Sequence, residues 1–273
     1  MAETLIKVDL KQSAYDNENV HNRWHPDIPM ACWVNPGDDF ILETYDWTGG
    51  FIKNNDSADD VRDIDLSIVH FLSGPVGVKG AEPGDLLVVD LLDIGAKQES
   101  QWGFNGFFSK KNGGGFLTDH FPQAQKSIWD FHGLYTSSRH IPGVNFAGLI
   151  HPGLIGCLPD PKMLATWNER EAALIATDPQ RVPGLANPPF AATAHMGRLA
   201  GEDHAKAAAE ARAPCRRVSM AAIATSRICR AAQRCTSRCM STVPAYRLAT
   251  CTSVRATAKS LSAARSKWPA GCI

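Results

Sequence analysis

Short stretches of alternating hydrophobic and polar residues run through most of this chain. Residues 40–45 (FILETY) and 65–72 (DLSIVHFL) alternate, and turn sequences rich in Gly, Pro and Asp lie beside them. Residues 86–94 (LLVVDLLDI) form a nearly continuous apolar run directly after a Pro-Gly-Asp turn. Alternation and short apolar runs between Gly and Pro turns are typical of β-strands. The pattern predicts many short strands, and it predicts that residues 73–75 (SGP) end one of them.

One segment has a helical pattern instead. In residues 163–177 apolar positions such as Leu164 and Trp167 recur at about three- or four-residue spacing, as on one face of a helix. Asp160 can cap the start of this helix, and the Asp-Pro pair at residues 178–179 can end it. One or two helices among many strands predict a mainly β fold with some α, built like a β-sandwich.

Composition adds little to this picture. Hydrophobic residues make up 44% of the chain and charged residues 21%, as in ordinary globular proteins. No apolar run approaches the roughly 18 residues that span a bilayer. The N-terminal residues lack the basic and then apolar layout of a signal peptide. We therefore expect a cytoplasmic protein that does not enter a membrane.

The formal net charge of zero averages two very different segments. All 28 acidic residues lie in residues 1–211, whereas residues 212–273 contain 12 of the 28 Lys and Arg residues and no acid. The same tail holds six of the eight cysteines, no Phe and one Gly. This break divides the chain into a body, residues 1–210, and a basic tail, residues 211–273.

A zinc site or a nucleic-acid-binding arm could explain such a tail, but neither pattern is complete. Structural zinc sites use two pairs of ligands, each pair spaced by roughly two to four residues. In the tail only Cys235 and Cys239 approach that spacing, and no His follows His204. The cations would attract phosphate, but only Tyr246 and Trp268 could stack on bases. We therefore expect no nucleic-acid partner and an unstructured tail.

The genetic code offers a third interpretation of the tail. An amino acid fixes most of the first two bases of its codon, so a shifted reading frame still constrains the hidden peptide. Read from the third base of each codon, residues 212–271 allow ARTVPPREHGGNCDIKDL, SRGSKVYFPVYVDG and AGLSVGDLHFSQGDGEITFCGAIEMAGW. These strings contain the glycines, acids, aromatic residues and β-type alternation that the written tail lacks. The tail is therefore predicted to be frameshifted, with the slip near Glu210.

Five segments of the body form a recognisable set of motifs. They are HNRWHPDIP (21–29), GAEPGDLLVVDLLDI (80–94), NGGGFLTDHFP (112–122), SRHIPGVNFAGLIHPGLIGCLP (138–159) and ATDPQRVPGLANPP (176–189). Together they resemble the formamidase branch of the acetamidase/formamidase family, and the hidden strings resemble the C-terminal signature of that family. The resemblance implies a sandwich-like β fold, hydrolysis of the C–N bond of a short linear amide such as formamide, and a homo-oligomer.

Amide hydrolysis requires an activated nucleophile or water, a stabiliser for the oxyanion and an acid for the leaving nitrogen. The chain has no G-x-S-x-G nucleophile elbow. Outside the tail only Cys32 and Cys157 could be thiol nucleophiles, and the apolar run around Cys157 favours a buried, inert thiol. Water activated by a divalent metal, zinc or a similar ion, suits the sequence better.

Carboxylates and imidazoles beside turns are the candidate site residues. Glu43 and Asp46 follow a predicted strand and could bind the metal, or they could be solvated charges at the strand end. Asp119 and His120 lie beside a Gly-rich loop and could act in catalysis, or could cap a turn and pack as ordinary polar residues. His151, before a Pro-Gly pair, is the residue that we favour as catalytic.

Three functions follow from these patterns. The first is a formamidase-like enzyme with a small amide as substrate. The second is a non-catalytic, truncated remnant, because the densest groups of His, Asp, Asn, Cys and Glu occur in the hidden strings HGGNCD and GDLHFSQGDGE. The third is a sandwich-like binding module whose basic tail attracts nucleic acid.

Overall fold

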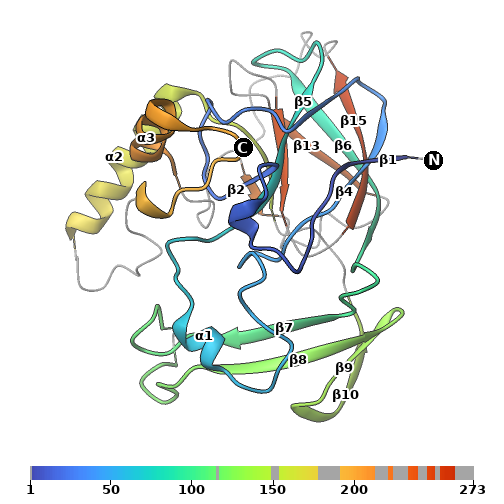
Figure 1. Cartoon of the computed structure of the whole chain (residues 1–273), viewed down its shortest axis with the longest axis vertical. Helices are drawn as coiled ribbons and strands as arrows, with labels where there is room; N and C mark the ends of the chain where they lie inside the picture. Colours follow the sequence, from blue (N-terminus) through green and yellow to red (C-terminus); the bar gives the residue numbers. More distant parts are fainter. Residues whose placement is uncertain are drawn as a thin grey trace, which may run out of the picture.

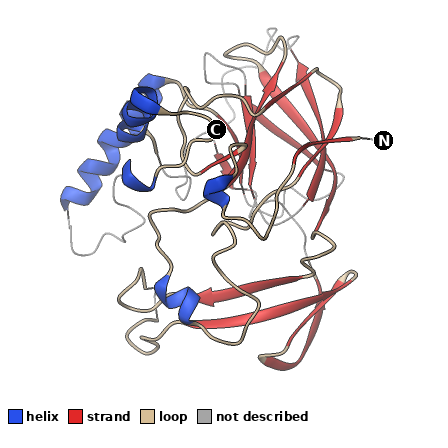
Figure 2. Ribbon diagram, viewed as in Figure 1, coloured by secondary structure: helices blue, strands red, loops and turns tan. Residues whose placement is uncertain are grey.

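The computed structural model describes residues 2–114, 117–148, 154–177 and 191–212 in full, and only the backbone at residues 221–223, 233–238, 245–249 and 253–261. Within these residues two β-sheets pack on each other, and a third sheet lies apart from them (Figures 1 and 2). The helices are few and lie outside the sheets. The chain is therefore mainly β with some α, which confirms the predicted fold class.

The two packed sheets combine strands that are far apart in the sequence. The first sheet has the order β1 (Glu3–Ile6), β4 (Asp39–Leu42), β15 (Ser253–Leu261), β6 (Leu86–Gly95) and β13 (Gln233–Arg238). The second has the order β12 (Ala221–Ile223), β11 (Leu154–Cys157), β14 (Ala245–Ala249), β5 (Leu72–Val78) and β2 (Val20–His21), with β3 (Cys32–Val34) beside β5.

A single apolar core holds these sheets together. Phe40 and Leu91 of the first sheet share one buried cluster with Val76 and Ile155 of the second. Each of these side chains is at most 3% exposed. Full burial of one such side chain stabilises a fold by roughly 1.5–3 kcal/mol. The apolar sides of the strands therefore pair face to face, as in the predicted sandwich.

The third sheet lies below the sandwich in Figure 1 and is antiparallel. Its order is β10 (Ile141–Ala147), β9 (Tyr135–Ser138), β8 (Gln125–His132) and β7 (Trp102–Phe107). Lys126 of β8 anchors the sheet, because its buried ammonium donates to Asp60 of α1 (Asp59–Asp63) at 2.7 Å and to the Lys53 carbonyl at 3.0 Å. A buried lysine with several acceptors fixes the position of the segments that it joins.

Two longer helices, α2 (Pro161–Thr177) and α3 (Gly201–Glu210), lie side by side on one flank of the sandwich (Figure 1). The Met163 N–H donates to Asp160 Oδ1 at 2.8 Å, so Asp160 caps α2 as predicted. The buried apolar face of α2 covers fewer residues than the sequence indicates, because Leu164 is buried whereas Leu174 is 52% exposed. None of the described helices combines the length and the apolar character needed to span a membrane.

Residues 65–72 do not form the predicted strand. The Asp65 carboxylate accepts a hydrogen bond from the Ser67 N–H at 2.8 Å, and the Asp65 carbonyl accepts one from the Ile68 N–H at 3.4 Å. This turn delays the strand, so that β5 begins at Leu72 and runs through residues 73–75, which were expected to end it. Every residue of β5 is buried. Packing in the middle of a sheet has outweighed the local preference for a turn.

The tail contributes the backbone of four described strands, whereas the sequence predicts no regular structure there. Strands β13 and β15 flank β6, and β14 lies between β11 and β5. Such pairing uses N–H and C=O groups that nearly every residue carries. It is therefore compatible with either reading frame, and the frameshift stays a prediction.

Candidate functional site

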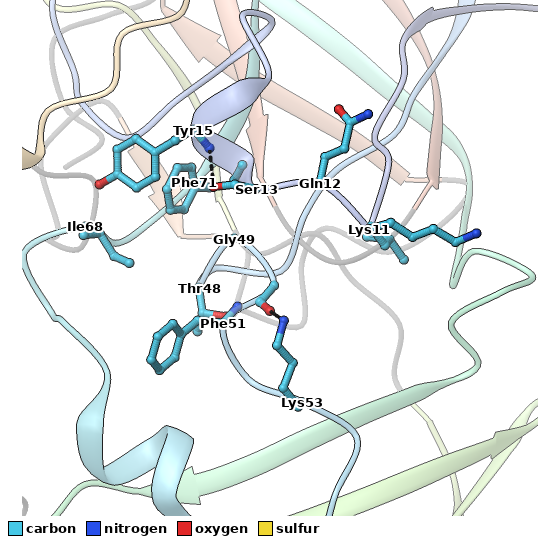
Figure 3. Close-up of a pocket in the computed structure, with 13 residues that line it drawn as sticks. Lys11, Gln12, Ser13, Tyr15, Thr48, Gly49, Phe51, Lys53, Ile68 and Phe71 are labelled. Carbon is cyan, nitrogen blue, oxygen red and sulfur yellow. Dashed lines mark hydrogen bonds between the residues drawn. The ribbon is translucent and has the colours of Figure 1, made fainter.

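A pocket of about 290 Å³ opens between residues 10–15 and residues 48–53 (Figure 3). Its inner part is formed by the buried side chains of Ala14 and Phe71, and its rim contains both polar and apolar exposed side chains. Ligand pockets usually measure roughly 300–1,000 Å³. The pocket therefore has the size for a small molecule.

Gly49 forms the wall of the pocket opposite Ser13. It has a φ of +69°, and a Cβ at this position would lie 2.6 Å from the Phe71 ring. Only glycine tolerates both the left-handed backbone and the close approach to the ring. The Gly-Gly pair at residues 49–50 thus allows the backbone of the loop to pack directly against the Phe71 ring.

Asp46 holds this wall in place. Its Oδ1 accepts hydrogen bonds from the Thr48 hydroxyl and from the Thr48 N–H, the latter at 2.7 Å, and its Oδ2 accepts one from the Gly50 N–H at 3.0 Å. Burial raises the pKa of Asp46, and the hydrogen bonds from Thr48 and Gly50 oppose this rise. The carboxyl group therefore serves the geometry of the loop.

Glu43 directly follows β4 and is also engaged. Its Oε2 accepts hydrogen bonds from the Val8 N–H and from the Lys97 ammonium, both at 2.8 Å. The Lys97 side chain is 12% exposed and that of Glu43 is 24% exposed. This largely buried pair ties β4 to the segments on either side of it.

These contacts bear on the predicted metal. Glu43 and Asp46 use their carboxylate oxygens for an ammonium and for N–H and O–H groups. Among the described residues, no group of three or more His, Cys, Asp or Glu is placed to hold a metal ion. The described side chains therefore do not fit a metal centre, and the predicted divalent ion would depend on groups outside them.

The predicted catalytic residues Asp119 and His120 lie on an exposed loop next to the third sheet. The Asp119 carboxylate pairs with the Lys110 ammonium at 2.5 Å, and this hydrogen bond lowers the pKa of Asp119. The backbone N–H of His120 donates to the Leu117 carbonyl at 3.0 Å. His151 lies outside the described residues. Within the described part of the chain, the hydrogen bonds of Asp119 and His120 do not involve Glu43 or Asp46.

Beside the pocket lies a group of hydrogen-bonded polar residues, partly buried, that the sequence patterns did not reveal. The Thr193 carbonyl accepts hydrogen bonds from the Tyr15 hydroxyl and from Asn22 Nδ2, both at 3.0 Å. The Thr193 hydroxyl oxygen accepts one from Arg23 Nη2 at 3.1 Å, and Arg23 is fully buried. The signal in the sequence is the HNRWH motif, in which every residue is at most 2% exposed although four of the five are polar.

Two histidines in this region have lowered pKa values. The His70 ring lies 5.4 Å from the Trp47 ring, and burial lowers the pKa of His70 to about 4. The His195 ring lies 5.4 Å from the Tyr15 ring, and burial also lowers the pKa of His195. Both rings are therefore mostly neutral at pH 7.

The fold and the sequence together define the class of this protein. A sequence model of the acetamidase/formamidase family matches residues 7–222. The chain therefore belongs to the acetamidase/formamidase family.

Particular relatives place the chain within that family. It is 64% identical over 208 residues to "Formamidase" from Methylophilus methylotrophus, an alignment that covers 76% of this chain and 51% of the relative. It is 55% identical over 210 residues to "Acetamidase" from Mycolicibacterium smegmatis, covering 74% of this chain and 52% of the relative. The chain thus spans about half the length of these curated relatives.

Solved structures give the same result. The structure titled "gamma lactamase from Delftia acidovorans" matches with a TM-score of 0.91 at 63% identity, over 95% of this chain and 68% of that one. An acetamidase from Bacillus halodurans matches with a TM-score of 0.62 at 15% identity, over 89% of this chain and 69% of that one. The second match shows a shared fold only.

Proposed function

We propose that this gene encodes a cytoplasmic, formamidase-like hydrolase that cleaves the C–N bond of a short linear amide, converting formamide to formate and ammonia. The observation that supports this most strongly is the 64% identity over 208 residues to a relative named formamidase. A missing methyl group changes binding in a small pocket by only about 1–3 kcal/mol. Acetamide is therefore a reasonable second substrate.

The chain as written is proposed to be inactive because its tail is out of frame. The family match ends at residue 222, shortly after the predicted slip near Glu210. The hidden strings HGGNCD and GDLHFSQGDGE would supply polar groups that the written chain lacks. A divalent metal, if present in the intact enzyme, would supply an activated water, and the intact enzyme is proposed to be a homo-oligomer.

Two genes test this proposal: the gene as recorded, and the same gene with one or two bases inserted or deleted near codon 210 to restore the frame. Both purified chains are assayed for ammonia release from formamide and acetamide. We expect turnover from the restored chain and none from the written chain. Equal turnover would overturn the frameshift, and a folded restored chain without turnover would overturn the amidase activity.

The restored chain also tests the predicted catalytic residue. Because general acid–base groups contribute roughly 10²–10⁴-fold to rates, His151→Asn should lower kcat by at least about a hundredfold. His132→Asn is the matched control, because His132 is an exposed histidine at the end of β8, and it should leave kcat nearly unchanged. Equal loss of activity in both variants, or in neither, would count against a catalytic role of His151.

A further inference from the structure

The pocket beside Gly49 divides its polar and apolar groups between two sides. Figure 3 shows Lys11, Gln12 and Lys53 on one side, and Tyr15, Phe51 and Phe71 on the other. Among the described residues that line the pocket, two are lysines and none is acidic. The lining therefore carries positive charge next to an aromatic surface.

Exposed apolar side chains surround the same opening. Leu10 is 37% exposed, Tyr15 40% and Phe51 39%. Single exposed apolar residues are common on protein surfaces, but several around one concave site are typical of ligand contact. The apolar side thus offers a surface for a hydrocarbon or aromatic group.

Residues on the polar side of the pocket have N–H and O–H groups that remain available to donate hydrogen bonds to a ligand. The Lys53 ammonium donates one hydrogen bond to the Gly50 carbonyl at 2.6 Å, which leaves two of its three N–H groups. Ser13 Oγ accepts a hydrogen bond from the Tyr15 N–H at 3.2 Å and keeps its own O–H for donation. Within the described residues the Lys11 ammonium takes part in no hydrogen bond or ion pair.

The carboxyl group of Asp46 lies behind the wall and does not line the pocket. Its oxygens accept hydrogen bonds from Thr48 and Gly50, and this binding turns them away from an incoming ligand. The Thr48 hydroxyl is committed to the same interaction. Lys53, which interacts electrostatically with Asp46, therefore presents the cationic group beside the aromatic side of the pocket.

We propose that this pocket binds a small organic carboxylate, with the anionic group at Lys53 and the organic part against Tyr15, Phe51 and Phe71. An ammonium group forms stronger hydrogen bonds to a carboxylate than to a neutral group. An inorganic anion would leave the apolar side unused. This proposal does not depend on amidase activity, because it concerns binding alone.

Ligand-observed NMR titration of the full 273-residue chain tests the site with benzoate as probe. Benzyl alcohol is the uncharged control of similar shape, and inorganic phosphate is the anion without an apolar part. We expect benzoate to bind saturably with a dissociation constant of about 1 mM. Benzyl alcohol and phosphate should each bind at least about tenfold more weakly. Raising the salt concentration should weaken benzoate binding, because the lysines are exposed.

Variants locate the binding. Lys53→Met should weaken benzoate binding by at least about fivefold, since it removes a charged donor. Lys11→Met should have a smaller effect, because the Lys11 side chain points outward in Figure 3. Lys79→Met, which removes an exposed lysine outside the pocket, should have no effect. Absence of saturable binding, equal binding of benzyl alcohol or phosphate, or equal affinity in all three variants would overturn the proposal. Amide turnover of the chain with the restored frame judges the proposed enzyme activity separately.

Discussion

At the scale of single residues, two ion pairs of the same chemistry, each a lysine with a carboxylate, differ in how deeply they are buried. The Lys97–Glu43 pair has side chains that are 12% and 24% exposed, whereas those of the Lys110–Asp119 pair are 60% and 81% exposed. Water screens an exposed pair and solvates each partner when the other is removed. A largely buried pair leaves its remaining partner poorly solvated.

Lys97→Met should therefore lower the free energy of unfolding by about 1–3 kcal/mol, because Glu43 would lose its cation. Lys110→Met should cause little measurable change, since the Asp119 carboxylate is already in water. Urea denaturation of both variants measures the difference. Equal effects would show that the Lys97–Glu43 pair contributes no more than a surface pair does.

His70 should make stability depend on pH. Its pKa is lowered by burial from 6.5 to about 4. Above pH 6.5 the ring is neutral in both states and contributes nothing. As the pH falls from 6.5 to about 4, the unfolded chain binds a proton that the folded chain does not. The free energy of unfolding should therefore fall by up to about 3 kcal/mol across this window.

Denaturation of the parent chain and of His70→Asn at several pH values isolates this effect, because the other titrating groups are common to both. The stability difference between the two should narrow or reverse as the pH falls below 6.5. A constant difference from pH 7 to pH 4 would contradict the lowered pKa.

The candidate pocket shows which site residues a sequence can reveal. Asp46 was selected because a carboxylate after a strand suggests chemistry, and its hydrogen bonds do hold the Thr48 and Gly50 backbone of the pocket wall. Tyr15 and Thr193 were not selected, because they are 178 positions apart and only the fold joins them. The predicted roles of Glu43, Asp46, Asp119, His120 and His151 stay predictions.

At the scale of elements, the loop at residues 46–50 depends on its two glycines for different reasons. Gly49 and Gly50 both have positive φ, but only Gly49 lies against the Phe71 ring. Gly50→Ala should cost about 1 kcal/mol, from backbone strain alone. Gly49→Ala should cost about 2–4 kcal/mol, since a Cβ would also overlap the ring. Thermal or urea unfolding of the two variants measures the loss in free energy of unfolding. Equal losses would show that the Phe71 ring does not pack against Gly49.

Elements differ in how closely they follow local sequence. The apolar run at residues 86–94 becomes β6, and the Asp160 cap starts α2, because neighbouring residues alone supply these signals. Strand β5 passes through residues 73–75 because its partners β14, β2 and β3 bury it on several sides. No local pattern contains those partners.

At the scale of the whole molecule, the sandwich needs strands from the tail. Within the described residues both neighbours of β6 in its sheet, β13 and β15, come from residues after 212. If the tail is out of frame as proposed, its backbone can still pair, but the restored frame would place a different set of side chains against the core. Loss of one buried Leu or Ile side chain costs roughly 2–5 kcal/mol.

The chain with the restored frame should therefore melt at a higher temperature than the written chain. Because 1 kcal/mol shifts the melting temperature of such a domain by about 2–4 °C, we expect a difference of at least about 5 °C. Circular dichroism on heating measures the melting temperature of each chain, and binding of a hydrophobic dye measures its exposed apolar surface. Equal melting and equal dye binding would show that the written tail packs as well as the restored one.

The sequence by itself determined the family, the mainly β character, the position of α2 and the break in composition near residue 210, because all of these are written in local patterns and motifs. Only the tertiary structure decided that Asp46 supports a pocket wall, that Glu43 is paired with Lys97, and that Tyr15 and Arg23 meet at Thr193. These contacts join residues that the chain keeps far apart. They form because two apolar sheet faces bury each other, and that burial fixes which polar groups come to share a site.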